Sequence, residues 1–267
     1  MAAGSILNNI SALSASRTLG ITQSGLDKTI GRLTTGMRIN KAQDDAAGLA
    51  ISNRLGADIR VSAQARRNAY DGISYLQVAD GALDEVTNLL TRASELAEQA
   101  RTGTISETNR KALDLEFQVI KDAIKNVGDN ARFNGEVVFS STGKFVAVAS
   151  FTNVDFTIGS MRGNLVSATN ILDTTAAAKA MTELDSLIQS VSMQRATIGS
   201  RQQYLTTIAN TLGIQVENFT SANSQIRDAN VADEVINLTK FQILTQTGIS
   251  SLAQSNQAAQ SLLGLLR

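Results

Sequence analysis

The sequence predicts a mainly α-helical protein, an elongated coiled-coil helical bundle with a small β-hairpin region near residues 133–160. Three observations lead to this class. Apolar residues recur at seven-residue intervals over two long segments, which is typical of coiled coils. Proline, which interrupts helices, is absent. Aromatic residues make up only 4% of the chain, and a long bundle seamed by Ala, Leu and Ile needs few of them.

The N-terminal half carries one heptad pattern, which predicts a helix over about residues 44–101. The residues of its register are Leu55, Ser62, Ala69, Leu76, Leu83, Leu90 and Ala97. Gly103 then breaks the pattern, and Ser106 is the candidate N-cap of a third helix. The apolar residues of that helix are Leu113, Phe117, Ile120, Ile124 and Val127.

The segment that follows, up to about residue 160, is rich in Val, Phe and Thr, and its alternation predicts one or two β-hairpins. Gly143 and Asn153 lie where turns are needed. A second heptad pattern then predicts one long helix over about residues 176–228. Its register is unbroken and consists of Leu184, Val191, Ile198, Leu205, Leu212, Phe219 and Ile226.

Both ends of the chain, residues 5–37 and 231–266, are amphipathic but contain glycines that each lower helix propensity by roughly 1 kcal/mol. Their candidate assembly residues are Ile6, Ile10, Leu13, Leu26, Leu33, Leu238, Leu252, Leu262 and Leu266. We expect each end to need a partner helix, for which neighbouring subunits are the natural source. The alternative is that both ends pack only on the central part of their own chain.

Composition argues against most enzyme classes. Histidine is absent, which removes the usual general base, the Ser-His-Asp triad and the commonest zinc ligand. Cysteine is also absent, so neither disulfides nor thiol chemistry are available. Carboxylate or lysine chemistry remains open, but we predict no enzyme, no metal and no cofactor. The 24 basic and 24 acidic residues balance, so bulk electrostatics indicate no nucleic-acid partner.

The N-terminal sequence MAAGSILNNI has no basic region and no long apolar core, so we expect no cleavable secretory signal. We also expect no membrane insertion, because no window approaches the roughly 20 apolar residues of a membrane span. A cytosolic protein and one exported without a cleaved signal both fit.

Asp44 and Asp45 are adjacent carboxylates, which raises the question of a metal site or acid–base chemistry. Neighbouring helical residues point about 100° apart, so the two carboxylates do not converge on one metal or one proton. An acidic pair does suit a helix N-terminus, where it caps free N–H groups and meets the positive end of the dipole. We therefore predict a helix start here and not a catalytic pair.

Blocks at both ends of the chain resemble those of bacterial flagellin. The N-terminal blocks are LTTG at 33–36, RIN at 38–40 and DDAAGLAI at 44–51. The C-terminal blocks are QIL at 242–244, LAQSNQ at 252–257 and LLR at 265–267, and FNG at 133–135 matches the family's helix-to-hairpin junction. The resemblance runs from end to end.

The resemblance implies a terminal coiled coil called D0, made of residues 1–40 with 230–267. It also implies a helical rod called D1, residues 41–229, which includes the hairpins. Only about residues 137–175 are available for an insertion, which is too short for outer domains D2 or D3. Five residues would form the D0–D1 connection: Arg38, Ile39, Asn40, Asp44 and Asp45.

The implied function is a structural subunit that is exported unfolded by the flagellar type III apparatus and polymerises into a filament for motility. Implied partners are further copies of the chain, an export chaperone, and the cap and hook-junction proteins. Export would place the filament outside the cell, and a periplasmic flagellum fits as well. Serine and threonine residues of the hairpin region, Ser140, Ser141 and Thr142, are candidates for O-linked sugars, although turn chemistry explains them equally.

Residues 89–100, LLTRASELAEQA, resemble the patch that animal Toll-like receptor 5 recognises in flagellins. Arg92, Leu96 and Glu116 match its members, and Glu95 lies between the first two. An arginine beside an apolar anchor is typical of an interaction hot spot. The alternative is an exposed helix face with an ordinary Arg–Glu pair.

Two other functions remain open. A hook–filament junction protein shares the D0 and D1 design but stacks only over a short zone. An intracellular coiled-coil scaffold would have ordered ends in the free monomer. A histidine-dependent peptidase insert, which some flagellins carry, is excluded by the lack of histidine and of room.

Overall fold

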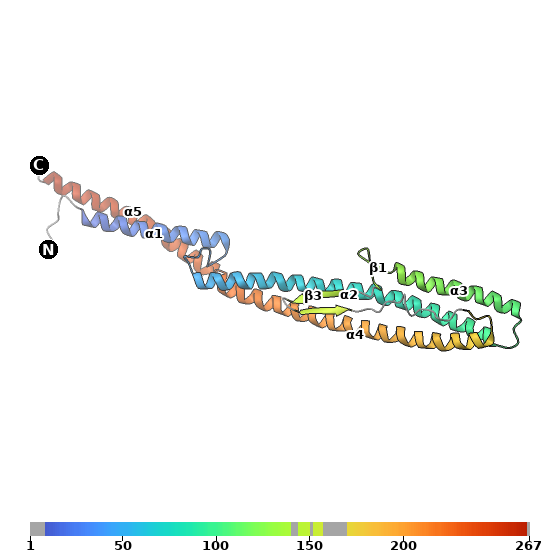
Figure 1. Ribbon diagram of the computed structural model, residues 1–267. Helices are drawn as coiled ribbons and strands as arrows, with labels where there is room; N and C mark the ends of the chain where they lie inside the picture. Colours follow the sequence, from blue (N-terminus) through green and yellow to red (C-terminus); the bar gives the residue numbers. More distant parts are fainter. Residues whose placement is uncertain (1–8, 140–143, 150–151, 157–169, 266–267) are drawn as a thin grey trace. The chain divides into compact units, whose positions relative to one another are not determined.

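The computed structural model describes residues 9–139, 144–149, 152–156 and 170–265, and these are mainly helical, as predicted (Figure 1). The helices are α1 (Ile10–Thr35), α2 (Ala46–Arg101), α3 (Glu107–Asn130), α4 (Thr174–Arg227) and α5 (Val231–Leu265). The strands are β1 (Arg132–Phe133), β2 (Glu136–Val137), β3 (Lys144–Ala149) and β4 (Thr152–Phe156).

The chain forms two compact units, which we describe separately. The terminal unit comprises Met1–Asp58 and Asn218–Arg267, and the central unit comprises Ile59–Glu217. The terminal unit therefore holds α1, α5, the first turns of α2 and the last turns of α4.

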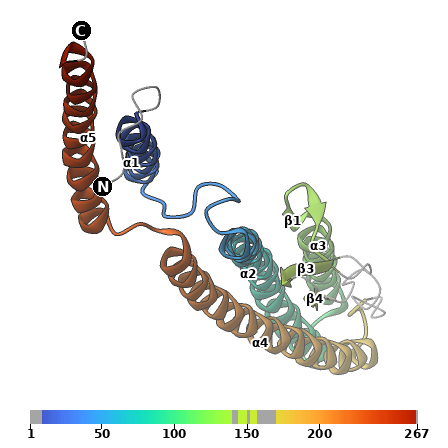
Figure 2. The ribbon, with the colours of Figure 1, turned by 90° about the vertical axis from the view of Figure 1, so that its left-hand side faces the viewer.

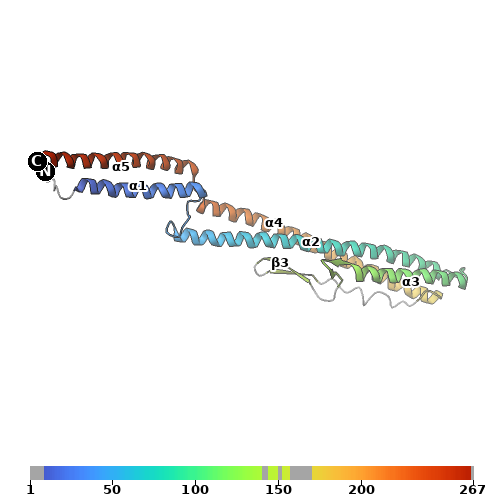
Figure 3. The same cartoon turned by 90° about the horizontal axis from the view of Figure 1, so that it is seen from above.

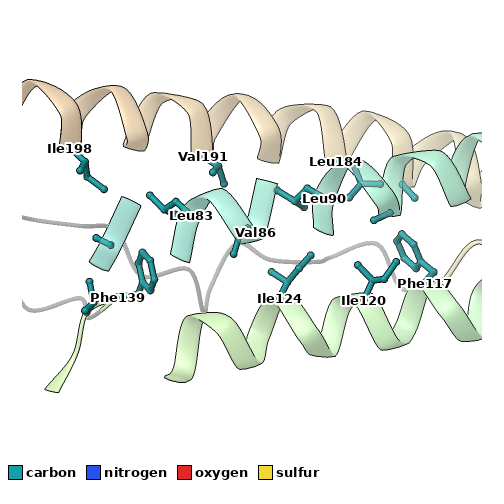
Figure 4. Packing of buried hydrophobic residues seen from close by; sticks show 14 of the residues in the cluster. Leu83, Val86, Leu90, Phe117, Ile120, Ile124, Phe139, Leu184, Val191 and Ile198 are labelled. Atoms are coloured by element: carbon teal, nitrogen blue, oxygen red, sulfur yellow. The ribbon is translucent and has the colours of Figure 1, made fainter. Parts of the chain in front are cut away.

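The two long helices confirm the heptad predictions, since α2 and α4 begin and end within two residues of the expected positions. In the central unit their register residues form one apolar core with α3. Figure 4 shows this core, with Leu83, Val86 and Leu90 of α2 between residues of α3 and α4. All the α4 register residues from Leu184 to Leu212 are buried. Burial of a regular seam explains why these helices are stable over more than fifty residues.

Helix α3 begins at its predicted cap, because the Ser106 side chain accepts a hydrogen bond from Asn109 N at 3.3 Å. Phe117, Ile120 and Ile124 face the core (Figure 4). Apolar positions that the helical spacing predicted therefore face the core, and this confirms the amphipathic interpretation of the segment.

The described part of the β region forms two antiparallel strand pairs, β1 with β2 and β3 with β4. Strands β1 and β2 join through Asn134 and Gly135, which both have positive φ (51° and 81°). A tight two-residue hairpin turn needs a positive φ at both central residues, and asparagine and glycine adopt this conformation most readily. This requirement accounts for the FNG block. Strands β3 and β4 pair with Val146 opposite Val154. The expected turn at Asn153 is wrong, because Asn153 pairs with Ala147 inside β4; Gly143 lies outside the described residues.

The β3–β4 hairpin docks on α2 at Gly72. A Cβ at Gly72 would lie 2.9 Å from Val146 Cγ2, so only glycine allows this approach. Asn68 Nδ2 donates to Ala147 O at 2.9 Å beside this contact. The first hairpin is also tied to α2, since Tyr75 Oη donates to Val138 O at 3.0 Å.

Candidate functional site

The paired chain ends are the candidate functional site. Helices α1 and α5 run antiparallel and lie side by side (Figure 2 and Figure 3). The expectation that each end needs a partner helix is met within the chain, because each terminal helix packs on the other. Two glycines make the approach close. A Cβ at Gly25 would lie 2.7 Å from the Phe241 ring, and one at Gly248 would lie 3.2 Å from Leu19 Cδ1.

Polar contacts fix the register of the pair at both ends. Asn9 Nδ2 donates to Ser255 O at 3.1 Å, and Arg32 Nη1 lies 3.1 Å from Glu234 Oε1. Between them the seam contains buried threonines, Thr22 and Thr29, where a strong coiled coil would have leucines. These polar contacts fix the register of the pair, while leucines such as Leu26 and Leu238 are only half-buried.

Large apolar side chains point outward from this pair. On α1 they are Ile10, Leu13, Ile21 and Ile30, and on α5 they are Val231, Val235, Ile236, Ile243, Leu244 and Ile249. Leu13 is 73% exposed and Ile243 is 66% exposed. Apolar surface of this extent on two adjacent helices is typical of an interaction surface.

The predicted assembly residues fall into three groups. Leu26, Leu33, Leu238 and Leu252 are half-buried, and Ile10 and Leu13 are exposed. Ile6 and Leu266 lie outside the described residues, and Leu262 belongs to α5 with a side chain that is not described. Sequence reasoning missed Ile21, Ile236 and Ile243 as assembly residues. Both faces of α1 and α5 carry apolar residues, so the helical pattern alone does not separate the inner face from the outer one.

The joint between the terminal helices and the long helices is a small hydrogen-bonded ladder. Gly36 ends α1 in the left-handed conformation (φ 68°), and its N–H donates to Arg32 O. Ala229 N then donates to Gly36 O at 2.9 Å, and Arg38 N donates to Arg227 O at 2.7 Å. The predicted connection is thus anchored on the residues between α4 and α5.

The predicted helix start is confirmed at Asp45, which directly precedes the first residue of α2, whereas Asp44 lies in the turn before it. Asp45 Oδ1 accepts from Gly48 N at 2.8 Å, which makes Asp45 the N-cap. Asp44 Oδ2 instead accepts from Lys41 N at 3.0 Å and closes the preceding turn. The hydrogen bond from Lys41 N–H is the main reason that the pKa of Asp44 lies below its ordinary value. Ile39 is buried beneath this turn, and Asn40 donates to Thr35 Oγ1 at 2.7 Å.

A polar cluster lies on α2 and α3 of the central unit. Arg92 Nη2 donates to Glu116 Oε1 at 2.7 Å, and Arg92 Nη1 donates to Glu95 Oε2 at 3.0 Å. The hydrogen bond to Glu116 is the largest cause of the raised pKa of Arg92. Leu96 does not share this surface, because it is only 1% exposed and packs in the core. Ser140, Ser141 and Thr142 lie outside the described residues.

Within the described part of the chain, no group of three or more His, Cys, Asp or Glu side chains could hold a metal ion. The helices described there also include none with the length and hydropathy of a membrane span.

Two family models match this chain. The bacterial flagellin N-terminal helical region matches residues 6–144, and the bacterial flagellin C-terminal helical region matches residues 181–266. The chain belongs to the bacterial flagellin family. The flagellin matches include α1, α2, α3 and the first hairpin on one side and most of α4 and α5 on the other.

Known flagellins of similar length agree with this assignment. A flagellar filament 33 kDa core protein of Treponema phagedenis is 36% identical over 284 residues, which cover 98% of this chain and 99% of that protein. A flagellin of Halalkalibacterium halodurans is 36% identical over 278 residues with the same coverage. The crystal structure of Bacillus cereus flagellin has a TM-score of 0.51 and 31% identity, and it covers 55% of this chain and 88% of that chain.

Proposed function

We infer that this chain is a structural subunit that polymerises with further copies into a bacterial flagellar filament. The full-length similarity to proteins named flagellin and flagellar filament core protein supports this function. The observation that carries it is the set of large apolar side chains on α1 and α5 that the described residues leave exposed. Copies that cover these side chains by a contact that does not close on itself form an open helical polymer.

Seeded assembly tests this function. Purified protein is added to sheared filament seeds, and elongation is followed by sedimentation and electron microscopy. Ile243→Gln is expected to raise the critical concentration at least about tenfold, because it removes a large exposed apolar side chain from the contact. Gln246→Ala, at an exposed polar position of the same helix, is the matched control and is expected to assemble normally. Failure of the native chain to elongate any seed would contradict the proposal.

We propose that residues 1–40 and 230–267 act as the D0 coiled coil and residues 41–229 as the D1 rod, without outer domains. The antiparallel pairing of α1 and α5 supports this division, and so does the ladder at Gly36, Arg38 and Ala229. Arg38, Ile39, Asn40, Asp44 and Asp45 would then form the D0–D1 connection. The proposal assigns no catalytic role and no cofactor to the chain.

We further propose that the chain is exported unfolded by the flagellar type III apparatus, with the help of an export chaperone, and assembles under the cap beyond the hook-junction proteins. A chain without cysteine cannot cross-link during transit. Weakly held ends can also remain unfolded until neighbours order them. Microscopy of intact cells and of cells without their outer layer would show whether the filament lies outside the cell or in the periplasm.

Recognition of the free subunit by animal Toll-like receptor 5 is a separate proposal. It depends on the Arg92–Glu95–Glu116 cluster, in which Arg92 is about half exposed. Leu96, which is buried, would contribute only by supporting the helix surface. Arg92→Ala is expected to lower the response of a receptor reporter cell at least about tenfold. Arg101→Ala is the matched control, because Arg101 is equally exposed on the same helix and pairs with Glu98. An unchanged response to Arg92→Ala rejects this proposal.

The seeded assembly also separates the alternative functions. A hook–filament junction protein would add only a short stack to each seed, whereas a filament subunit elongates for as long as protein is supplied. An intracellular scaffold would not add to the seeds at all.

A further inference from the structure

Two buried polar atoms lie on the joint between α4 and α5. They are Nε of Arg227, the last residue of α4, and Oε2 of Glu234, in the first turn of α5. Within the ranges that the structure describes, neither atom has a hydrogen-bond partner, and Glu234 is only 7% exposed. A buried polar group without a partner destabilises the fold, and more so when it belongs to a charged side chain. Such groups in a native protein need a specific explanation.

Glu234 is only half satisfied. Arg32 Nη1 contacts Oε1 at 3.1 Å, which ties α1 to α5 through one oxygen. A carboxylate accepts hydrogen bonds at both oxygens, and guanidinium groups usually pair with carboxylates through two parallel bonds. Oε2 is therefore available to a second cationic donor.

Arg227 and Glu234 belong to the same small scaffold. Arg227 O accepts from Arg38 N, and the next hydrogen bond of the ladder joins Ala229 N to Gly36 O. Glu234 N donates to Asn230 O at 3.1 Å, which begins α5. Only residues 228–230 separate the two helices, so small backbone rotations there would change the position of Arg227 relative to Glu234. Residues at the ends of elements commonly act as such hinges.

We propose that this joint has two arrangements and that in the second the Arg227 guanidinium binds the free oxygen of Glu234. Both unpartnered atoms would then be satisfied in one step, while Arg32 keeps its own oxygen. The inference rests on the proposed function, because packing of a neighbouring copy on the exposed faces of α1 and α5 selects the second arrangement. A partner shifts such an equilibrium only by binding one arrangement more tightly than the other.

A double-mutant cycle on the full chain tests the exchange of partners. Arg227→Met removes the donors and keeps the apolar stem, and Glu234→Gln removes the acceptor charge. In seeded assembly, Arg227→Met is expected to raise the critical concentration at least about tenfold in the native background. In the Glu234→Gln background it is expected to have less than about a twofold effect. Arg201→Met, at an exposed arginine of the same helix, is the matched control and should leave the critical concentration unchanged.

The free protein supplies the second measurement. Arg227→Met should not lower its thermal unfolding midpoint, because Nε has no partner there to lose. Electron cryomicroscopy of the native filament should then place the Arg227 guanidinium within hydrogen-bond distance of Glu234 Oε2.

Three results would overturn the inference: no change in critical concentration, an equal change in both backgrounds, or a lowered midpoint of free Arg227→Met. None of these touches the filament function itself, which fails only if the native chain does not elongate seeds.

Discussion

Gly48, in the first turn of α2, lies directly against the residues that begin the helix. A Cβ at this position would collide with the Asp45 carboxylate and would lie 2.8 Å from Ile39 Cδ1. Asp45 is the N-cap and Ile39 is buried, so neither can move away without losing a cap or a packing contact. The glycine of the DDAAGLAI block is therefore explained by close approach.

Gly48→Ala is expected to lower the free energy of unfolding by about 1–3 kcal/mol, because overpacking outweighs the better helix propensity of alanine. Gly56→Ala is the control on the same helix. Open space surrounds Gly56, so this substitution should stabilise the protein by about 0.4–1 kcal/mol. Urea unfolding followed by circular dichroism measures both. Equal stabilisation by the two alanines would mean that the close approach at Gly48 does not exist.

Asp44 gives the joint a defined pH dependence. Its pKa is lowered from 3.8, first by the hydrogen bond from Lys41 N–H and also by the one from Asn40 N–H and the charges of Arg32 and Lys28. A lowered folded-state pKa contributes stability above the unfolded-state value, and this stability is lost as the pH falls through the folded-state value.

Asp44→Ala should therefore be less stable than the native chain at neutral pH, and the difference should disappear in strong acid, below the lowered pKa. Thermal unfolding between pH 7 and pH 2 measures this. A difference that is independent of pH would show that the carboxylate charge is not involved.

Helices α1 and α5 meet where Phe241 lies over Gly25. Gly25→Ala is expected to push the Phe241 ring away and to weaken the pairing of the two helices, with a loss of about 1–3 kcal/mol. Gly31→Ala, at an open position of the same helix, should instead strengthen α1. Amide hydrogen exchange of α1 and α5 compares the two variants. Slower exchange in both variants would indicate that helix propensity, and not packing in the seam, limits the stability of the α1–α5 pair.

Helix α3 holds the segment that returns from the hairpins to α4. Ile171 N donates to Asp114 Oδ1 at 2.8 Å, and Ile171 is fully buried. Asp114→Ala would leave this N–H without its partner and should cost about 1–3 kcal/mol. Asp122→Ala, at an exposed position of the same helix, is the control and should be near neutral. Urea unfolding measures the free energy of unfolding of both variants. Equal losses in the two variants would mean that the return segment is held by apolar packing alone.

At the scale of the whole molecule, the two kinds of seam predict different local stabilities. The core of the central unit is built mainly from fully buried Leu, Ile, Val and Ala, whereas the fully buried residues of α1 are threonines and many large apolar residues of α1 and α5 are exposed. Limited proteolysis of the free protein should therefore remove the ends first and leave a resistant fragment of about residues 41–229. In the filament the ends should be protected, because neighbours cover them. Mass spectrometry of the fragments tests both statements, and equally resistant ends in the free protein would favour the scaffold function.

Local periodicity accounts for the parts of the fold that were predicted correctly. The bounds of α2 and α4, the cap at Ser106 and the helix start at Asp45 follow from spacing and side-chain chemistry within a few residues. The prediction of a turn at Asn153 was wrong because a residue that suits turns also pairs within a strand when its neighbours pair there. Leu96 matched a surface motif by its spacing from Arg92, although burial against α3 and α4 decides its exposure.

The sequence by itself determined the helical class, the long helices and the family, because these depend on repeats and motifs along one chain. Only the tertiary structure decided which face of each terminal helix is inside. Both faces of α1 and α5 carry apolar residues, so the outward position of Ile21 and Ile243 and the inward position of Thr22 and Phe241 depend on the partner helix. The unpartnered atoms of Arg227 and Glu234 were equally hidden from the sequence, because hydrogen-bond satisfaction depends on neighbours brought together by folding.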